Sequence, residues 1–392
     1  MKTYRVASLL TVLVLLAAAC TPAAAPTEAP PAPAPTEPPQ PATTSAGGPA
    51  PTSPASAEPT LAKPTSTELN LYGWSDYVPQ QLLDDFSAEY GIKVNYDTYS
   101  SNEEMLAKLQ AGASGYDLVI PSDYTVTAML NQDLLQPIDL AQIPNFKNLD
   151  PRFTNKGYDP GNKYTIPYQW GTTALAYDKT KVPFEPKSWA DLWDPKFKGR
   201  LVMLDDEREV TGMALQTLGL DKNSTDPAQL DQAKQKMVEL KPNIVLFNSD
   251  DPETSLITGE TWAGLVYNGN AALARQQDPD IEYICPKEGC GLWFDNLAVP
   301  KSAPHADAAM AFMNFMLEPK ESILITQEFP YSNPNKEALE YLKANDPSTY
   351  ESYTAFSATN PPDDFLARAV EVKDVGAATT LYDQLWTDFK GQ

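Results

Sequence analysis

The 392-residue chain has a single histidine, His305, and only three cysteines. One histidine excludes an HExxH zinc site and leaves no partner for a histidine cluster. Three cysteines are too few for a four-cysteine zinc or iron–sulfur site, so we expect no metal and no cofactor. Basic residues are also scarce, because 29 Lys and Arg stand against 52 Asp and Glu, for a formal net charge of -23. A polyanion needs a basic surface, so this composition argues against nucleic-acid binding and leaves room for a cationic ligand.

The N-terminus lacks a hydrophobic run long enough to span a bilayer comfortably. A short basic start precedes an apolar run over residues 6–19, which is typical of the core of a signal peptide. The run ends in Leu-Ala-Ala-Ala-Cys, close to a bacterial lipobox, although Ala17 stands where leucine is usual. We therefore predict a lipoprotein signal peptide over residues 1–20 with the lipid on Cys20. The alternative is an ordinary secretory signal.

Residues 21–66 are rich in Pro, Ala and Thr and poor in large apolar side chains. Such a segment cannot bury enough apolar surface to offset its ordering entropy. We predict a disordered linker between the lipid anchor and a folded body. The leader and linker hold as many basic as acidic residues, so the negative charge belongs to the folded body.

Cys285 and Cys290 remain as an even pair if Cys20 carries a lipid. Turn residues separate them, and strand-like runs lie on either side. This pattern favours a disulfide that closes a β-hairpin outside the cytoplasm. Two free thiols, or half of a metal site with too few other ligands to complete it, are the alternatives.

Beyond the linker, strand-like runs alternate with amphipathic helical patterns. One helix is predicted to begin at Pro79 and to end at Gly91, and a capping box at Ser101 opens the next. The alternation predicts βαβ units, and its restart near residue 201 predicts two α/β lobes. The predicted strands cover residues 69–72, 92–96, 116–120, 201–204, 243–247 and 264–268.

Acidic and aromatic side chains directly follow several of these strands. Ligands of open α/β sheets bind beyond the carboxyl ends of strands, so these positions predict the binding site. They include no lysine and only one arginine, Arg208. A cation with apolar segments would find both carboxylates and ring faces there. The motifs are Trp74-Ser75-Asp76-Tyr77, Ser122-Asp123-Tyr124, Asp205-Asp206-Glu207-Arg208-Glu209, Tyr267-Asn268-Gly269 and Trp293-Phe294-Asp295-Asn296.

Over residues 69–385 the sequence resembles the bacterial spermidine/putrescine-binding receptors of ABC importers. Matching segments occur in the same order along the chain. They are GWSDYVP at 73–79, YDLVIPSDY at 116–124, IPYQWGTTALA at 166–176, SWADLW at 188–193, DDEREV at 205–210, FNSD at 247–250, PKEG at 286–289 and DVGAA at 374–378.

The resemblance implies a periplasmic-binding-protein-like fold of type II. This is an α/β fold of two lobes with mixed β-sheets flanked by helices. Crossover segments, expected near residues 170–176 and 295–299, would form a hinge. Lobe 1 would comprise residues 67–171 and 294–340, and lobe 2 residues 172–293 and 341–392.

The resemblance also implies a function and a set of binding residues. The protein would be a monomeric, lipid-anchored extracytoplasmic receptor without enzymatic activity. It would capture a polyamine between its lobes and deliver it to membrane permease and ATPase subunits. The family's aromatic box would fall on Trp74, Tyr77, Tyr124, Tyr267, Trp293 and Tyr331, its ammonium-binding acids on Asp76, Asp206, Glu209 and Asp295, and hydroxyl contacts on Ser75 and Ser122.

Three positions depart from the family pattern. Tyr267 stands where spermidine-preferring receptors usually have tryptophan, and Asp76 replaces a common glutamate. Val372 stands where a glutamine commonly holds one amine. These departures bear on the choice of polyamine rather than on the ligand class.

Other interpretations of the same residues stay open. Asp206 and Glu209 fit a capping-box variant in which Asp206 only caps a helix and Glu209 bonds back to its start. Carboxylates beside aromatic rings also describe a glycosidase cleft, and an aromatic cleft can bind a carbohydrate. The sequence has no GxSxG motif and no P-loop. A carbohydrate-binding receptor would not require an acidic cluster.

Overall fold

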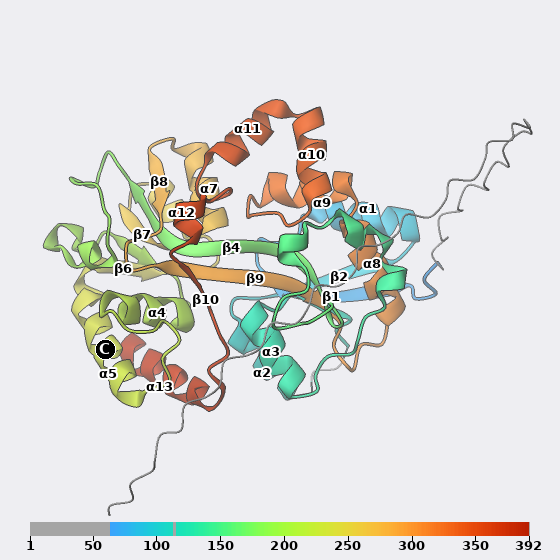
Figure 1. Cartoon of the computed structure of the whole chain (residues 1–392), viewed down its shortest axis with the longest axis horizontal. Coiled ribbons are helices and arrows are strands. Elements are labelled where there is room, and N and C mark those ends of the chain that lie inside the picture. The colour runs from blue at the N-terminus through green and yellow to red at the C-terminus, as the bar shows by residue number, and fades with distance from the viewer. Residues whose placement is uncertain (1–62, 113–114, 392) are drawn as a thin grey trace, which may run out of the picture. The chain divides into compact units, whose positions relative to one another are not determined.

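The computed structural model describes residues 63–112 and 115–391 (Figure 1). The predicted signal peptide, Cys20 and almost all of the predicted linker lie outside these residues. The strands are β1 Glu68–Trp74, β2 Lys93–Tyr99, β3 Leu118–Val119, β4 Thr165–Asp178, β5 Leu201–Met203, β6 Ile244–Phe247, β7 Ala263–Tyr267, β8 Ile281–Ile284, β9 Cys290–Ala298 and β10 Ala369–Glu371.

Helices follow most of the strands, as the sequence pattern predicts. Within the described residues, none is both long and apolar enough to cross a membrane. The α-helices are α1 Gln80–Tyr90, α2 Asn102–Gln110, α3 Asp123–Asn131, α4 Glu207–Thr217, α5 Pro227–Leu240, α6 Glu253–Ile257, α7 Asn268–Gln277, α8 Ala306–Met316, α9 Pro319–Glu328, α10 Lys336–Asn345, α11 Pro347–Ala355, α12 Asp363–Leu366 and α13 Thr379–Lys390.

The predicted helix boundaries near the N-terminal end of the described chain are confirmed. α1 begins at Gln80, one residue after the predicted start at Pro79, and Gly91 ends it with φ 70°, a left-handed conformation that glycine adopts without steric cost. The Ser101 side chain caps α2 by accepting the backbone N–H of Glu104. The second half of the predicted capping box differs, because the Glu104 carboxylate accepts the N–H of Ser100 at 3.1 Å.

Described strands from both lobes pair into one mixed sheet. Its order is β2-β1-β3-β9-β4-β7-β5-β6, with β8 on β4 and β10 on β9. The outer pairs β1–β2, β1–β3, β5–β6 and β5–β7 are parallel, as the βαβ pattern predicts. The long strands β4 and β9 are antiparallel and join the two parallel halves (Figure 1). They are therefore the crossover segments, and this mixed architecture confirms the predicted fold class.

Separate hydrophobic cores lie on the two sides of these central strands. In the first half, Leu71 and Ile120 of the sheet region pack with Phe86 of α1. In the second half, Leu201 of β5 packs with Met213 of α4. The predicted lobe boundaries at 171/172 and 293/294 fall inside β4 and β9, and they stay predictions.

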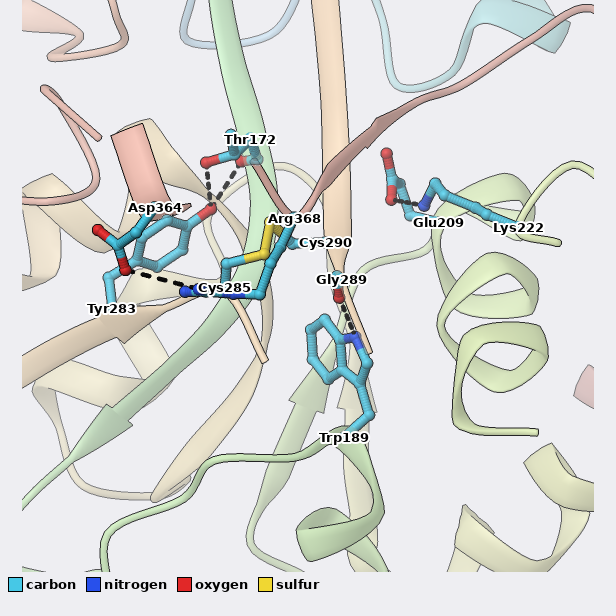
Figure 2. Close-up of a disulfide and its surroundings, with 10 residues drawn as sticks. All are labelled: Thr172, Trp189, Glu209, Lys222, Tyr283, Cys285, Gly289, Cys290, Asp364 and Arg368. Carbon is cyan, nitrogen blue, oxygen red and sulfur yellow. Dashed lines mark hydrogen bonds and ion pairs between the residues drawn. A yellow bond between two sulfur atoms is a disulfide. The ribbon is translucent and has the colours of Figure 1, made fainter. Parts of the chain in front are cut away.

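The Cys285–Cys290 disulfide is present, but the predicted hairpin is wrong (Figure 2). Strands β8 and β9 do not pair with each other, because both pair antiparallel with β4. Ile284 of β8 faces Leu175, and Gly291 of β9 faces Thr173. The two strands therefore follow each other along one edge of β4. The disulfide closes the loop that connects the end of β8 to the start of β9.

Candidate functional site

A cavity of about 610 Å³, including its mouth, lies where residues after β1, β3, β5 and β7 face residues of β9. This is the strand-end position expected of a ligand site in an α/β fold. Of the predicted binding residues, only Asp76 is missing from the cavity wall. The lining residues are Trp74, Ser75, Tyr77, Asn102, Ser122, Tyr124, Asp206, Arg208, Glu209, Ser249, Asp250, Tyr267, Trp293, Asp295, Tyr331 and Val372.

Asp76 lies in an exposed turn beside the cavity-lining Ser75 and Tyr77. Its φ of 48° falls in the left-handed region, which aspartate tolerates better than most residues. The turn keeps the neighbouring side chains in the wall and leaves this carboxylate in solvent. A ligand contact by Asp76 remains a prediction.

Four aromatic rings form a continuous wall of the cavity. Tyr267 and Trp293 have ring centroids 6.1 Å apart, Trp293 and Tyr331 5.7 Å, and Tyr331 and Tyr77 5.1 Å. All three pairs meet edge to face, an arrangement that aromatic quadrupoles favour. The wall can therefore contact an aliphatic chain over several methylene groups.

Two glycines make room for this wall. A Cβ atom at Gly171 of β4 would lie 2.5 Å from Cζ2 of Trp293. A Cβ at Gly269 of α7 would lie 2.6 Å from the Tyr331 ring. Neither position accepts a side chain without moving an aromatic residue of the site.

Asp295 of β9 is a buried carboxylate of the cavity wall and is 5% exposed. Its Oδ2 accepts the Tyr77 hydroxyl at 2.7 Å, and its Oδ1 accepts the Ser122 hydroxyl at 2.6 Å. Burial raises the pKa of Asp295 to about 7, although the two hydroxyl donors oppose the rise. A cation beside this carboxylate would favour its ionised form.

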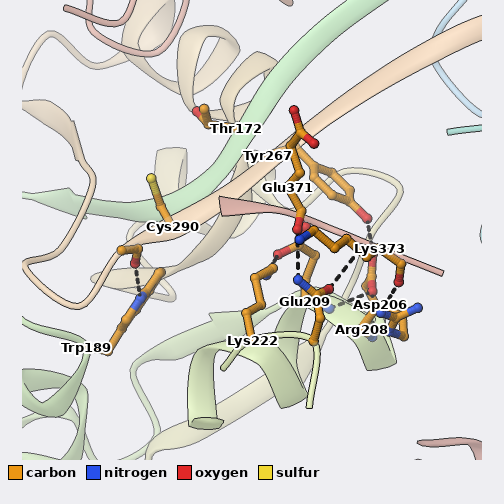
Figure 3. A network of polar contacts seen from close by, with 12 residues as sticks. Thr172, Trp189, Asp206, Arg208, Glu209, Lys222, Tyr267, Cys290, Glu371 and Lys373 are labelled. Carbon is orange, nitrogen blue, oxygen red and sulfur yellow. Dashed lines mark hydrogen bonds and ion pairs between the residues drawn. The ribbon is translucent and has the colours of Figure 1, made fainter. Parts of the chain in front are cut away.

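Asp206 has two roles at the start of α4 (Figure 3). Its Oδ1 accepts the backbone N–H groups of Arg208 and Glu209, both at 2.9 Å, so Asp206 caps α4 as the capping interpretation predicts, but capping is not its only role. Its Oδ2 accepts the Tyr267 hydroxyl at 2.8 Å at the cavity wall. Capping thus fixes the orientation of a carboxylate that also lines the cavity.

Glu209 lines the cavity but already has a cationic partner, Lys222 (Figure 3). The Lys222 ammonium lies 2.5 Å from Oε2 of Glu209, and both side chains are buried. Burial raises the pKa of the Glu209 carboxyl, and the Lys222 ammonium opposes that rise.

Arg208 places a cation in the cavity wall itself, whereas Lys222 reaches Glu209 from behind the lining residues. Its guanidinium lies 5.2 Å from the ring centre of Tyr124 and 4.8 Å from that of Tyr382. It also donates to the Lys373 carbonyl at 2.8 Å. It is therefore held by ring faces and a backbone carbonyl rather than by the acids beside it in sequence.

Sequence reasoning missed several residues of the site. Asn102 donates to the Ser122 and Tyr124 oxygens, both at 3.0 Å, and no sequence signal marks it. Ser249 and Asp250 follow β6 and could have been found from their strand-end position. Lys222 lies in the loop between α4 and α5, away from any strand end.

A ligand-sized cavity between two α/β halves that are joined by crossover strands defines the class of two-lobed solute-binding proteins. Residues 81–358 match the family model described as bacterial extracellular solute-binding protein. The chain belongs to this family, and the resemblance found in the sequence is confirmed.

The relatives that this chain matches are named for the polyamines that they bind. The chain is 41% identical to the spermidine/putrescine-binding periplasmic protein of Escherichia coli over 327 residues, covering 82% of this chain and 91% of the relative. It is 31% identical to the putrescine/cadaverine-binding protein of Pseudomonas aeruginosa over 344 residues, covering 84% and 95%. The structure of a putative spermidine/putrescine ABC transporter protein from Listeria monocytogenes superposes with a TM-score of 0.79. It is 34% identical and covers 83% of this chain and 99% of its own.

Proposed function

We propose that this protein is an extracytoplasmic receptor that captures a polyamine in the cavity and delivers it to the permease and ATPase subunits of an ABC importer. The single observation that carries the proposal is the environment of the Asp295 carboxylate. Its carboxylate is buried among aromatic rings, and in the described residues its side-chain partners are two neutral hydroxyls. The polyamine ligands of the relatives support the same ligand class.

A polyamine suits the two kinds of surface that the cavity offers. A carboxylate about 4 Å from an ammonium contributes roughly 4 kcal/mol at an effective dielectric constant of about 20, before desolvation. Each methylene buried against the aromatic wall contributes about 0.8 kcal/mol. Desolvation of the charges cancels much of the first contribution. The rings therefore set most of the affinity, and the positions of the carboxylates select the ligand.

A carbohydrate-binding receptor and a secreted glycosidase fit the site less well. A glycosidase needs two carboxyl groups free to act as acid and as base or nucleophile. Glu209 is paired with Lys222, and Asp206 accepts the N–H groups of its helix. We therefore propose a binding role without catalysis. A neutral sugar would also leave the charge of Asp295 without a partner.

The cellular setting is part of the proposal. The lipobox-like sequence that ends at Cys20 supports a receptor anchored to the membrane by lipid alone, and the protein would act as a monomer. Mass spectrometry of the mature N-terminus would detect diacylglycerol on Cys20. A mature chain that starts elsewhere without lipid would contradict the anchor.

Calorimetry with putrescine, cadaverine, spermidine, spermine and two neutral sugars tests the proposed function. We expect at least one polyamine to bind and the sugars to give no signal. Asp295→Asn should weaken polyamine binding by well over tenfold. Asp231→Asn, an exposed change on α5, serves as the matched control and should leave the affinity unchanged. Sugar binding without any response to polyamines would overturn the proposal.

A further inference from the structure

The buried ion pair between Glu209 and Lys222 neutralises one of the carboxylates that line the cavity. The Glu209 and Lys222 side chains are only 4% and 2% exposed, and their charged atoms are 2.5 Å apart. Figure 2 and Figure 3 both show the lysine reaching its partner from the loop that follows α4.

Two glycines allow this pair to form. The aliphatic stem of Lys222 crosses α4 at Gly212, where an added Cβ would lie 2.7 Å from its Cγ. The carboxylate of Glu209 rests against Gly291 of β9, where an added Cβ would lie 2.6 Å from Oε2. The neighbouring Asn223 fixes the loop by donating to the Glu371 carbonyl at 2.9 Å. The lysine is thus held in place by surrounding structure rather than by its charge alone.

The pair changes the number of carboxylates that a ligand can neutralise. Separating two buried opposite charges leaves each without compensation, which is strongly unfavourable. Among the cavity-lining acids, Asp295 and Asp206 keep carboxylate oxygens bound by hydroxyl groups rather than by a basic side chain. Asp250 is exposed at the cavity edge, where water screens its charge. Two acids therefore remain for ligand ammonium groups inside the cavity.

We propose that Lys222 is a built-in counter-ion that occupies Glu209 in place of a ligand ammonium, so that the site selects diamines over triamines. A diamine brings two ammonium groups for two available carboxylates. A third ammonium would find Glu209 already neutralised and would be repelled by the Lys222 charge. This inference rests on the proposed polyamine-binding function and adds the residue that sets ligand length.

The test compares putrescine and spermidine by calorimetry on the wild type and on Lys222→Met. The wild type should favour putrescine, and Lys222→Met should shift the affinity ratio at least tenfold toward spermidine because Glu209 becomes available. The double variant Glu209→Gln with Lys222→Met removes both charges and should return the ratio toward that of the wild type. Thermal melts establish that each variant is folded.

The outcomes separate this inference from the function on which it rests. A wild type that binds no polyamine contradicts the proposed function itself. A wild type that prefers spermidine, or a ratio unchanged in folded Lys222→Met, overturns the role of Lys222 alone. A crystal structure of the wild type with putrescine gives an answer even if the variants do not fold. The Lys222–Glu209 contact should persist in it, and a ligand ammonium on Glu209 with Lys222 displaced would refute the inference.

Discussion

Replacing Asp295 by asparagine should stabilise the ligand-free protein while it removes ligand binding. The wild-type carboxyl is 5% exposed, and burial raises its pKa to about 7. A carboxyl whose pKa is higher in the folded state binds its proton more tightly there than in the unfolded chain. The Asp295 carboxyl therefore adds to the free energy of unfolding of the wild type at acidic pH, and this contribution is lost as the pH rises through about 7.

The size of the effect follows from the shift. A rise from 3.8 to about 7 spans roughly three pKa units, which corresponds to at most about 4 kcal/mol at alkaline pH. An amide escapes this cost but accepts from only one of the two hydroxyls, Tyr77 and Ser122, and must donate to the other. We therefore expect Asp295→Asn to gain about 1–3 kcal/mol at pH 8.

Urea unfolding of ligand-free protein at pH 8 and at pH 5 measures this gain. The advantage of the variant should shrink by about 2–3 kcal/mol at pH 5, where the carboxyl of the folded wild type is protonated. Calorimetry at pH 8 should show the loss of polyamine binding in the same variant, with Asp231→Asn as the unchanged control. A variant that is less stable than the wild type at both pH values, or that binds polyamine normally, would refute the reasoning.

Three further results are expected. Polyamine affinity should fall about tenfold from pH 8 to pH 6, because the ligand must displace a proton from Asp295, whose pKa is near 7; a flat calorimetric profile would contradict this. Gly171→Ala should destabilise the fold by about 1–3 kcal/mol and weaken ligand binding, since its Cβ would clash with Oδ1 of Asn268 and lie 2.5 Å from Cζ2 of Trp293; an unchanged melting temperature and affinity would count against the tight contact. Changing Cys285 and Cys290 to serine should cost about 2 kcal/mol in urea unfolding, because the disulfide closes only a short loop, and leave affinity within a few-fold; lost binding in a folded variant would show that the loop shapes the cavity.

Local sequence signals predicted the elements that carry the site. The Gly91 stop, the Ser101 cap and the strand-end position of Ser122 depend on residues close in sequence, and the structure confirms them. The resemblance added residues far apart in the chain, such as Tyr331, which local patterns would have assigned to the core. The Tyr331 ring belongs to the core and to the site, because it packs in the first hydrophobic core and also lines the cavity.

Features set by long-range pairing could not be predicted. The hairpin was expected because turn residues separate Cys285 from Cys290, but the partner of both flanking strands is β4, more than 100 residues earlier. Lys222 was missed because its contact with Glu209 depends on the absence of side chains at Gly212 and Gly291. Only a folded structure shows that a lysine stem fits such a gap.

The most direct test of the central claim is a crystal structure of the protein with putrescine. One ligand ammonium should lie about 2.7–2.9 Å from a carboxylate oxygen of Asp295, with the methylene chain against the Trp293 and Tyr331 rings. The opposite finding would be a cavity that holds an uncharged molecule, or putrescine bound elsewhere with Asp295 still bonded only to its two hydroxyl neighbours.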